Sequence, residues 1–351
     1  MVSAYLRLCL IEEETNTSQQ LAERVSRRIL RDKCNPLELP NASFHQLHSA
    51  LPVARKRFAI DTVVKLSAAL RFFGEGAYQK GVGRQVDVGL SQSSFSHVLS
   101  EVLNVFEECL CNQWIKWPTK DEMREIALDF HQQFNIPGIV GCIDGTHVRI
   151  IGPRNNKHLY YNRKGYYSMN VLLVCDNKMA IRYVDASHAG ACHDSLIWNT
   201  SELRVSMEQD YLLGTRNVWL LGDAGYPLEP WLLTPRRSAE EGSTESKFNE
   251  VHARGRNIVE RTNGVLKNRW RCVLGARELH YSPKKAAQIT NVGCALHNIC
   301  LKYRCDDTPF ISTRASQPEI SEHVQFKESE SHSSFLNEAK RIRANIGNCF
   351  M

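Results

Sequence analysis

Four acidic residues stand out by their places in the sequence. Asp144 lies within the strand-like run "GCIDGTHVRI", and Asp223 ends the apolar run in "WLLGDAGYP", with a glycine close behind in both cases. Burying an unpaired carboxylate costs roughly several kcal/mol. Asp144 therefore needs a buried hydrogen bond, an Arg partner such as Arg149, an exposed strand end or a metal ion. Asp194, in "ACHDSLIW", lies where a strand gives way to a helix, and Glu260 is an isolated acid in a basic helix.

Two of these acids also have ordinary structural explanations. Asp194 could be the N-cap of the helix that follows it, because a side-chain carboxylate there accepts hydrogen bonds from free backbone N–H groups. Glu260 could form a salt bridge with Arg256 or Arg261, which are close to it on a helix. The acids are widely separated in sequence, so only the fold can bring them together. Their spacing alone does not establish a site.

Clustered carboxylates would predict a particular chemistry. Carboxylates a few ångströms apart repel one another, and each takes up a proton unless cations neutralise them. Two Mg²⁺ ions about 3.5 to 4 Å apart would do so, one activating a water and the other stabilising the leaving oxygen of a phosphodiester. Oxygen ligands favour Mg²⁺ or Mn²⁺ over zinc. A zinc site is the alternative at "CALHNICLKYRC", although its helical spacing and apolar neighbours favour a core face.

The segments that must position these acids read as an α/β fold. Four stretches are strand-like: "IVGCIDGTHVRII", "YSMNVLLVCD", "AIRYVDASH" and "NVWLLGDAGY". We expect the first three to form an antiparallel meander with short connections, and "HDSLIWNTSEL" to be a helix before the fourth. A helix is expected from about Phe248 to Trp270, and another after Pro283. This order predicts a ribonuclease H-like nuclease core within residues 135–305.

The chain before this core reads as an N-terminal segment (1–60) and a helical region (61–115). In the helical region, Asp61 and Ser91 are expected N-caps, and a short helix is expected between the two long ones. Helix, short helix, glycine turn and helix is the helix-turn-helix order, in which Gln92 and Ser96 would enter a DNA groove. A plain helical bundle would have the same pattern. The tail, 306–351, is expected to be poorly ordered apart from a short helix at "FLNEAKRIRANI".

Basic residues concentrate in two segments. Residues 254–277 contain seven basic residues against one acid, and residues 154–167 combine four basic residues with four tyrosines. Basic groups neutralise phosphates and tyrosines stack on bases, so this composition suits nucleic acid, although a solvated surface can have it too. The candidate DNA-binding residues are Gln92, Ser96, Arg163, Lys164, Arg256 and Lys267.

The overall composition narrows the class of protein. The chain has 351 residues, of which 42% are hydrophobic and 23% charged, as is typical of soluble globular proteins. No apolar run approaches the roughly 18 residues of a membrane helix, and the first residues do not resemble a secretory signal. The twelve cysteines form no CxxC pair, which favours reduced thiols and hence the nucleus and cytoplasm. The net charge of +6 suits an anionic partner.

Six ordered blocks between about residues 60 and 303 resemble the PIF/Harbinger transposases. They are "GCIDGTHV", "NRKGYYSMNVLLVCD", "CHDS", "LLGDAGYPL", "IVERTNGVLKNRWRC" and "CALHNI". The resemblance implies a DDE-type DNA endonuclease in which Asp144, Asp223 and Glu260 are catalytic and hold divalent metal together with Asp194. It also implies a separate Myb/SANT-like protein partner. Because the family includes a domesticated nuclease, it leaves open whether this chain transfers DNA strands, only cuts DNA, or is a silent DNA-binding or scaffold protein.

Overall fold

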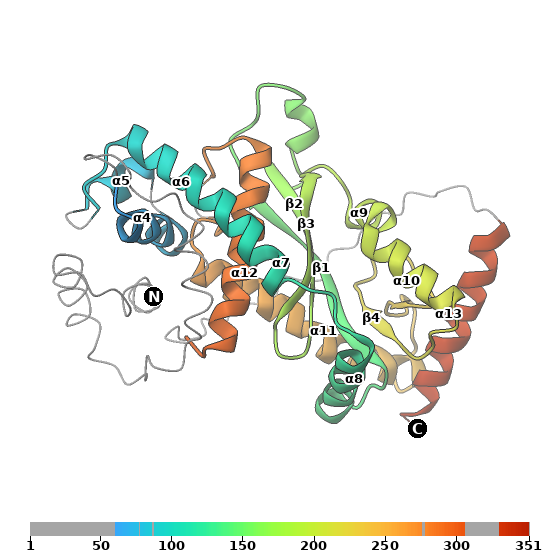
Figure 1. The fold of residues 1–351 in the computed structure, drawn as a ribbon. Helices are drawn as coiled ribbons and strands as arrows, with labels where there is room; N and C mark the ends of the chain where they lie inside the picture. The colour runs from blue at the N-terminus through green and yellow to red at the C-terminus, as the bar shows by residue number, and fades with distance from the viewer. Residues whose placement is uncertain (1–59, 77, 86–87, 276–277, 306–329, 351) are drawn as a thin grey trace. The chain divides into compact units, whose positions relative to one another are not determined.

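The computed structural model describes residues 60–76, 78–85, 88–275, 278–305 and 330–350 (Figure 1). The predicted N-terminal segment and residues 306–329 of the predicted tail lie outside this part of the chain. The chain divides into two compact units, and the boundary between them falls inside strand β1 and helix α11. The described residues of the first unit are 60–115, 148–151 and 265–305, and those of the second are 116–147, 152–264 and 330–350.

The first unit is helical. Its elements are α4 (Thr62–Glu75), α5 (Gln79–Gly83), α6 (Gln92–Phe106), the π-helical turn η2 (Glu107–Cys111), α7 (Asn112–Trp114) and α12 (Pro283–Lys302). Asp61 caps α4 by accepting a hydrogen bond from the Val63 backbone N–H at 2.7 Å, and Gly76 ends α4 with φ 61°. Ser91 likewise caps α6. Both predicted caps and the short helix between the long ones are confirmed, whereas their contact with DNA stays a prediction.

Aromatic side chains form much of the core of this unit. The Phe73 ring packs edge-on against Trp270 with ring centroids 5.9 Å apart, and Phe72 contacts both Phe95 and Tyr281. Edge-to-face pairs of this kind add about 0.5–1.5 kcal/mol beyond the burial of their area. They hold α4 to α6 and to the segment that precedes α12.

The second unit contains a five-stranded sheet in the order β3-β2-β1-β4-β5. The strands are β1 (Ile139–Arg149), β2 (Ser168–Cys175), β3 (Ile181–Ala189), β4 (Trp219–Leu221) and β5 (Leu232–Leu233). Strands β2 and β3 are antiparallel, whereas β4 runs parallel to both β1 and β5. Every residue of β2 is buried, as expected for a strand covered on both faces. The predicted mixed α/β architecture is confirmed.

Three details of the strand region differ from the prediction. The connection from β1 to β2 is not short, because residues 150–167 include the 3-10 turn η3 (Lys157–Tyr160). The single expected helix is two helices, α9 (Asp194–Thr200) and α10 (Glu202–Leu212), because Ser201 ends the first and caps the second. Strand β5 was not predicted, since two residues are too few to show an alternating pattern.

Helices and apolar side chains cover the sheet. Helix α8 (Lys120–Phe134), which was not predicted, contributes Phe130 to a core cluster with Ile139 of β1 and Cys175 of β2. Helix α11 (Thr244–Arg269) adds Val259 to the same cluster. A second cluster joins α9 and α10 to Leu220 of β4, whose neighbour Leu221 belongs to the first cluster, so the sheet is covered on both faces.

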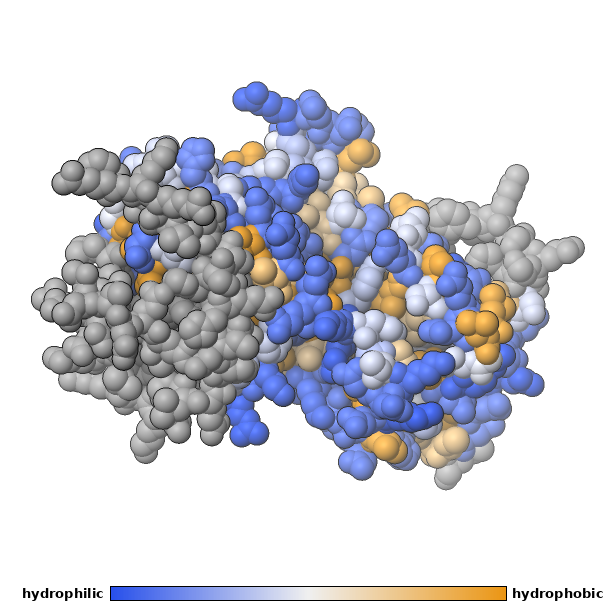
Figure 2. Space-filling model, viewed as in Figure 1, coloured by the Kyte–Doolittle hydropathy of each residue, from blue (hydrophilic) through white to orange (hydrophobic). Residues whose placement is uncertain are grey.

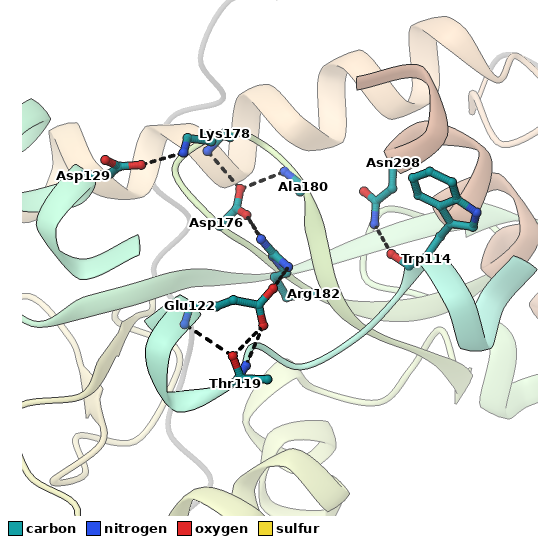
Figure 3. A network of polar contacts seen from close by, with 9 residues as sticks. All are labelled: Trp114, Thr119, Glu122, Asp129, Asp176, Lys178, Ala180, Arg182 and Asn298. Atoms are coloured by element: carbon teal, nitrogen blue, oxygen red, sulfur yellow. Dashed lines mark hydrogen bonds and ion pairs between the residues drawn. The ribbon is translucent and has the colours of Figure 1, made fainter. Parts of the chain in front are cut away.

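Polar contacts fix α8 to the turn between β2 and β3 (Figure 3). Thr119 and Glu122 form a capping box at the start of α8. Lys178 pairs with Asp129 of α8 at 2.7 Å, and Arg182 of β3 reaches Glu122 at 3.9 Å (Figure 3). Exposed pairs of this kind contribute little individually, about 0–1 kcal/mol. Together they set the position of α8 relative to the turn.

The C-terminal helix α13 (Glu330–Asn348) is longer than the short helix predicted in the tail, and it packs into the second unit. It lies beside α10 in Figure 1, and Phe335 stacks edge-on against Tyr211 and Trp231. Ile346, at its far end, is buried in the first core cluster. These residues are therefore part of the unit's core.

The visible surface is mostly hydrophilic, with hydrophobic residues in small separate groups (Figure 2). No helix in the described parts of the chain has the length and apolar character needed to cross a membrane.

Candidate active site

The sheet brings Asp144 and Asp223 together. Strands β1 and β4 are parallel neighbours, and Cys142 lies opposite Leu221. Asp144 and Asp223 each come two residues after this pair, and Asp223 is close enough to raise the pKa of Asp144. The Asp223 carboxylate accepts a hydrogen bond from the Gly225 backbone N–H at 2.8 Å. Asp144 lies inside β1 and Asp223 follows the end of β4, and a rigid sheet positions such side chains accurately.

Asp194 reaches the same place from the start of α9. The N-cap of that helix is His193 and Asp194 is its first residue, so the structure does not give Asp194 the capping role. The Asp194 carboxylate instead accepts a hydrogen bond from Asn170 Nδ2 at 2.7 Å. It lies directly against Gly145, where an added Cβ would be 2.2 Å from Asp194 Oδ1. The glycine after Asp144 therefore provides the space that Asp194 occupies.

Helix α11 carries three polar side chains that lie near Asp144. Arg256, Glu260 and Asn263 are spaced i, i+4 and i+7, which places them on one helix face. Asn263 Nδ2 donates to Asp144 Oδ2 at 3.0 Å, and Arg256 Nη1 lies 3.4 Å from Asp144 Oδ1. Arg256 Nη2 also pairs with Glu260 Oε1 at 2.6 Å. The predicted salt bridge between Glu260 and Arg256 is therefore present.

The acids of this site act on one another's pKa values. Burial, together with the charges of Asp223, Asp194 and Glu260, raises the pKa of Asp144 to about 7 against the opposing effect of Arg256. Burial also raises the pKa of Asp194, where the hydrogen bond from Asn170 acts in the opposite direction. A bound cation would stabilise the ionised form of such acids, so this group is a candidate cation-binding site.

Two further polar residues belong to this site, although the sequence did not single them out. Asn170 holds Asp194, and its own Oδ1 is buried without a hydrogen-bond partner. The hydroxyl of Tyr226 is also buried without a partner, and burial together with Asp194, Asp144 and Asp223 holds the pKa of Tyr226 well above its usual range. An asparagine inside the apolar run "MNVLLVC" was the available signal for Asn170.

Comparison with known proteins assigns this arrangement to a family. The sequence model described as DDE superfamily endonuclease matches residues 143–298. The Xenopus laevis protein named "Putative nuclease HARBI1" is 33% identical over 80% of this chain and 80% of its own length. The chain belongs to the Harbinger-like nuclease family of the DDE superfamily. The human protein of the same name is 31% identical over 84% of this chain and 81% of its own length.

A plant protein is a more distant relative of this chain. The Arabidopsis thaliana "Protein ALP1-like" is 26% identical over 70% of this chain and 63% of its own length. No solved structure matches the chain. The predicted family is therefore confirmed, and the match begins one residue before Asp144 and includes all four acids.

DDE superfamily endonucleases generally use divalent metal ions, and the donor types at this site fit such an ion. The four acids supply carboxylate oxygens, and the orphaned buried Oδ1 atoms of Asn170 and Asn263 add two amide oxygens. Oxygen-only donors suit Mg²⁺ and Mn²⁺. In the described part of the chain, however, no three His, Cys, Asp or Glu side chains lie close enough together to enclose an ion. Arg256 instead contacts two of the acids.

The candidate zinc segment has other contacts in the Harbinger-like fold. The Cys300 thiol donates to the Leu296 carbonyl of its own helix at 2.7 Å, and His297 Nδ1 lies 3.3 Å from Arg269. Cys294 is fully buried. These side chains face the core of the first unit, as the apolar neighbours indicated.

The predicted DNA-binding residues are spread over both units. Arg163 and Lys164 are exposed in the connection before β2, in the same unit as the four acids. Gln92 and Ser96 lie in the first turn and a half of α6, with Gln92 exposed and Ser96 half-buried. Lys267 also belongs to the first unit. The role of these six residues in DNA binding stays a prediction.

Proposed function

We propose that this chain is a divalent-metal-dependent DNA endonuclease of transposase origin, which hydrolyses phosphodiester bonds. The observation that carries the proposal is the convergence of acids far apart in sequence. Asp144 lies on β1 and Asp223 just beyond the end of the parallel neighbour β4, and Asp194 packs against the residue after Asp144. Arg256 connects Asp144 to Glu260. A purely structural role would not need four mutually repelling acids at one end of a sheet.

The order of the strands and helices along the chain also supports this proposal. Strand β1, antiparallel β2 and β3, two helices, and then β4 parallel to β1 follow the chain order of a ribonuclease H-like core, which we place within residues 135–305. Helices α4, α5 and α6 supply the elements of a helix-turn-helix in residues 61–115. We propose that this region contacts DNA through Gln92 and Ser96.

The residues of the site have distinct proposed roles. Asp144 lies between the other acids and is the shared metal ligand, while Asp194, Asp223 and Glu260 complete the donor set. Asn170 orients the carboxylate of Asp194 through its hydrogen bond, and Asn263 orients that of Asp144. When bound, two divalent ions would supply an activated water and a stabilised leaving oxygen. Asp144 must be ionised to act as a ligand, so a bound cation and a proton compete for it.

A cleavage assay on supercoiled and linear DNA, with and without Mg²⁺ or Mn²⁺, tests the proposal. Metal-dependent nicking or linearisation would support the endonuclease. DNA binding without cleavage under any of these conditions would instead indicate a domesticated, catalytically silent DNA-binding or scaffold protein. A joined product between donor and target DNA would add strand transfer by the freed 3′ hydroxyl. The family resemblance further leads us to propose a Myb/SANT-like protein partner and a location in the nucleus and cytoplasm.

The metal-induced stabilisation should grow as the pH rises through 7. The pKa of Asp144 is raised to about 7, above its unfolded value, so the folded protein favours the protonated acid. Without metal, this group's contribution to stability therefore falls as the pH rises from about 4 to about 7. A divalent ion needs the ionised form. The Tm difference with and without Mn²⁺ should be larger at about pH 8 than at about pH 6, and an equal difference at both values would contradict the placement of metal on Asp144.

Arg163 and Lys164 should supply phosphate contacts in the same unit as the acids. Replacing both by Gln should lower DNA affinity and reduce the slope of log K against log salt by roughly one per lost contact. Fluorescence anisotropy at several salt concentrations measures both quantities. A matched control is the double substitution of Lys247 and Lys340, which are exposed in the same unit, by Gln. If both double variants change the slope equally, only net charge matters and the proposed contacts are wrong.

A further inference from the structure

The guanidinium of Arg256 occupies the position beside the acids where a metal cation would be expected to bind. Its guanidinium lies 3.4 Å from Asp144 Oδ1 and 2.6 Å from Glu260 Oε1, so one cation serves two of the four acids. The side chain is 20% exposed, and the opposing effect of burial on its pKa is outweighed by Asp144, Glu260 and Asp223, which raise it. A planar guanidinium with five donors suits such a bridge between two carboxylates.

We propose that Arg256 is the resident counter-cation of the acid cluster, and that a divalent ion binds by displacing its guanidinium from Asp144 and Glu260. This inference rests on the proposed metal site. A divalent ion on the same oxygens would lie within a few ångströms of the guanidinium, and like charges at that distance repel strongly. The two cations therefore exclude each other. The acids are not close enough to enclose an ion in the described structure, and a guanidinium bridging two of them provides the physical reason.

The guanidinium of Arg256 is also able to move away from the two acids. It comes from a helix face, and Glu260, to which it makes its shorter bond, is 42% exposed, so this part of the bridge borders solvent. Rotation of the long arginine side chain can break both bonds without moving the helix backbone. Asn263 keeps its separate hydrogen bond to Asp144, which holds the carboxylate in place after Arg256 has moved. Arg256 is therefore a positioning residue that sets how readily the site takes up metal.

The test compares Mn²⁺ binding by the wild type and by Arg256→Gln, using calorimetry and the Mn²⁺-induced rise in Tm. We expect the variant to melt at a lower temperature without metal, because two acids lose their counter-ion. We expect it to bind Mn²⁺ about tenfold more tightly, the change produced by removing a competing ion pair worth about 1.4 kcal/mol. Arg254→Gln is the matched control, because Arg254 is exposed on the same helix and the substitution removes the same charge. It should leave the Mn²⁺ affinity within a factor of about two.

A second measurement does not depend on the variant's stability. In ¹⁵N-labelled wild-type protein, the Nε–H signal of Arg256 can be identified by its absence in Arg256→Lys. Titration with diamagnetic Mg²⁺ should shift this signal and leave that of Arg254 unchanged. An unshifted Arg256 signal at saturating Mg²⁺ would show that the guanidinium stays in place and would overturn the inference.

The outcomes separate this inference from the proposed function. In one outcome, the wild type binds Mn²⁺ while Arg256→Gln binds it equally or more weakly. Arg256 would then be an orienting partner of Asp144, which would contradict the displacement and leave the metal site supported. No Mn²⁺ binding by either protein would reject both. Binding by Arg256→Gln alone would support displacement in its strongest form, with the guanidinium excluding metal from the resting site.

Discussion

An Asp144→Asn variant is expected to fold and to bind DNA but to lose metal-dependent cleavage. The substitution keeps the shape of the side chain and removes the charge that would be shared between two ions. Cleavage should fall by more than about 100-fold, which corresponds to more than about 2.7 kcal/mol of activation free energy. The Mn²⁺-induced rise in Tm should disappear. Without metal, the variant should be no less stable than the wild type at about pH 8, because a buried acid that favours protonation has been removed.

The control for this variant is Asp210→Asn, which makes the same change on α10. It should retain both cleavage and the metal-induced rise in Tm. If Asp144→Asn instead lowers the Tm and keeps the full response to Mn²⁺, Asp144 is a structural acid paired with Arg256, and the catalytic interpretation is wrong. Measuring the Tm with and without metal therefore distinguishes the two roles even in a protein that does not cut DNA.

The placement of Asp144 and Asp223 was largely readable from the sequence. Asp144 interrupts an apolar strand segment and Asp223 follows one, and the alternation of a strand fixes which face each of its side chains is on. Local signals also predicted the helix caps Asp61 and Ser91, because capping depends on the cap side chain and a backbone N–H two or three residues away. Features that depend on a few neighbouring residues can be predicted from those residues.

The contacts among the acids could not be predicted from the sequence in the same way. Nothing near Asp194 in the chain indicates that its carboxylate lies on Gly145, and Asp144 pairs with Arg256 on a helix 112 residues further along the chain. Such pairs depend on how strands and helices pack. Strand β5 and the core role of α13 were missed for the same reason, since both are defined by their neighbours in the fold.

Replacing Gly145 by Ala tests the convergence of the acids without removing any of them. An added Cβ would lie 2.2 Å from Asp194 Oδ1, 2.5 Å from its Cγ and 2.8 Å from its Oδ2, so it meets the whole carboxyl group. The carboxylate cannot simply turn away, because Asn170 holds it at 2.7 Å. Overpacking of this kind costs about 1–3 kcal/mol of stability. Cleavage should fall by about 100-fold, since displacing a reacting or positioning group by about 1 Å can have that effect.

Gly264→Ala provides the matched control, because nothing lies within 4 Å of a Cβ added at this helical glycine of the same unit. It should keep full cleavage and raise stability by up to about 1 kcal/mol, the helix preference of Ala over Gly. A double-mutant cycle then identifies the clash. Asp194→Ala removes the carboxyl group that the new methyl would meet, so Gly145→Ala should cost about 0.5–3 kcal/mol less in that background than in the wild type. If urea unfolding gives the same cost in both backgrounds, the methyl meets something other than Asp194. The convergence of Asp194 on Asp144, and with it the proposed metal site, would then be wrong.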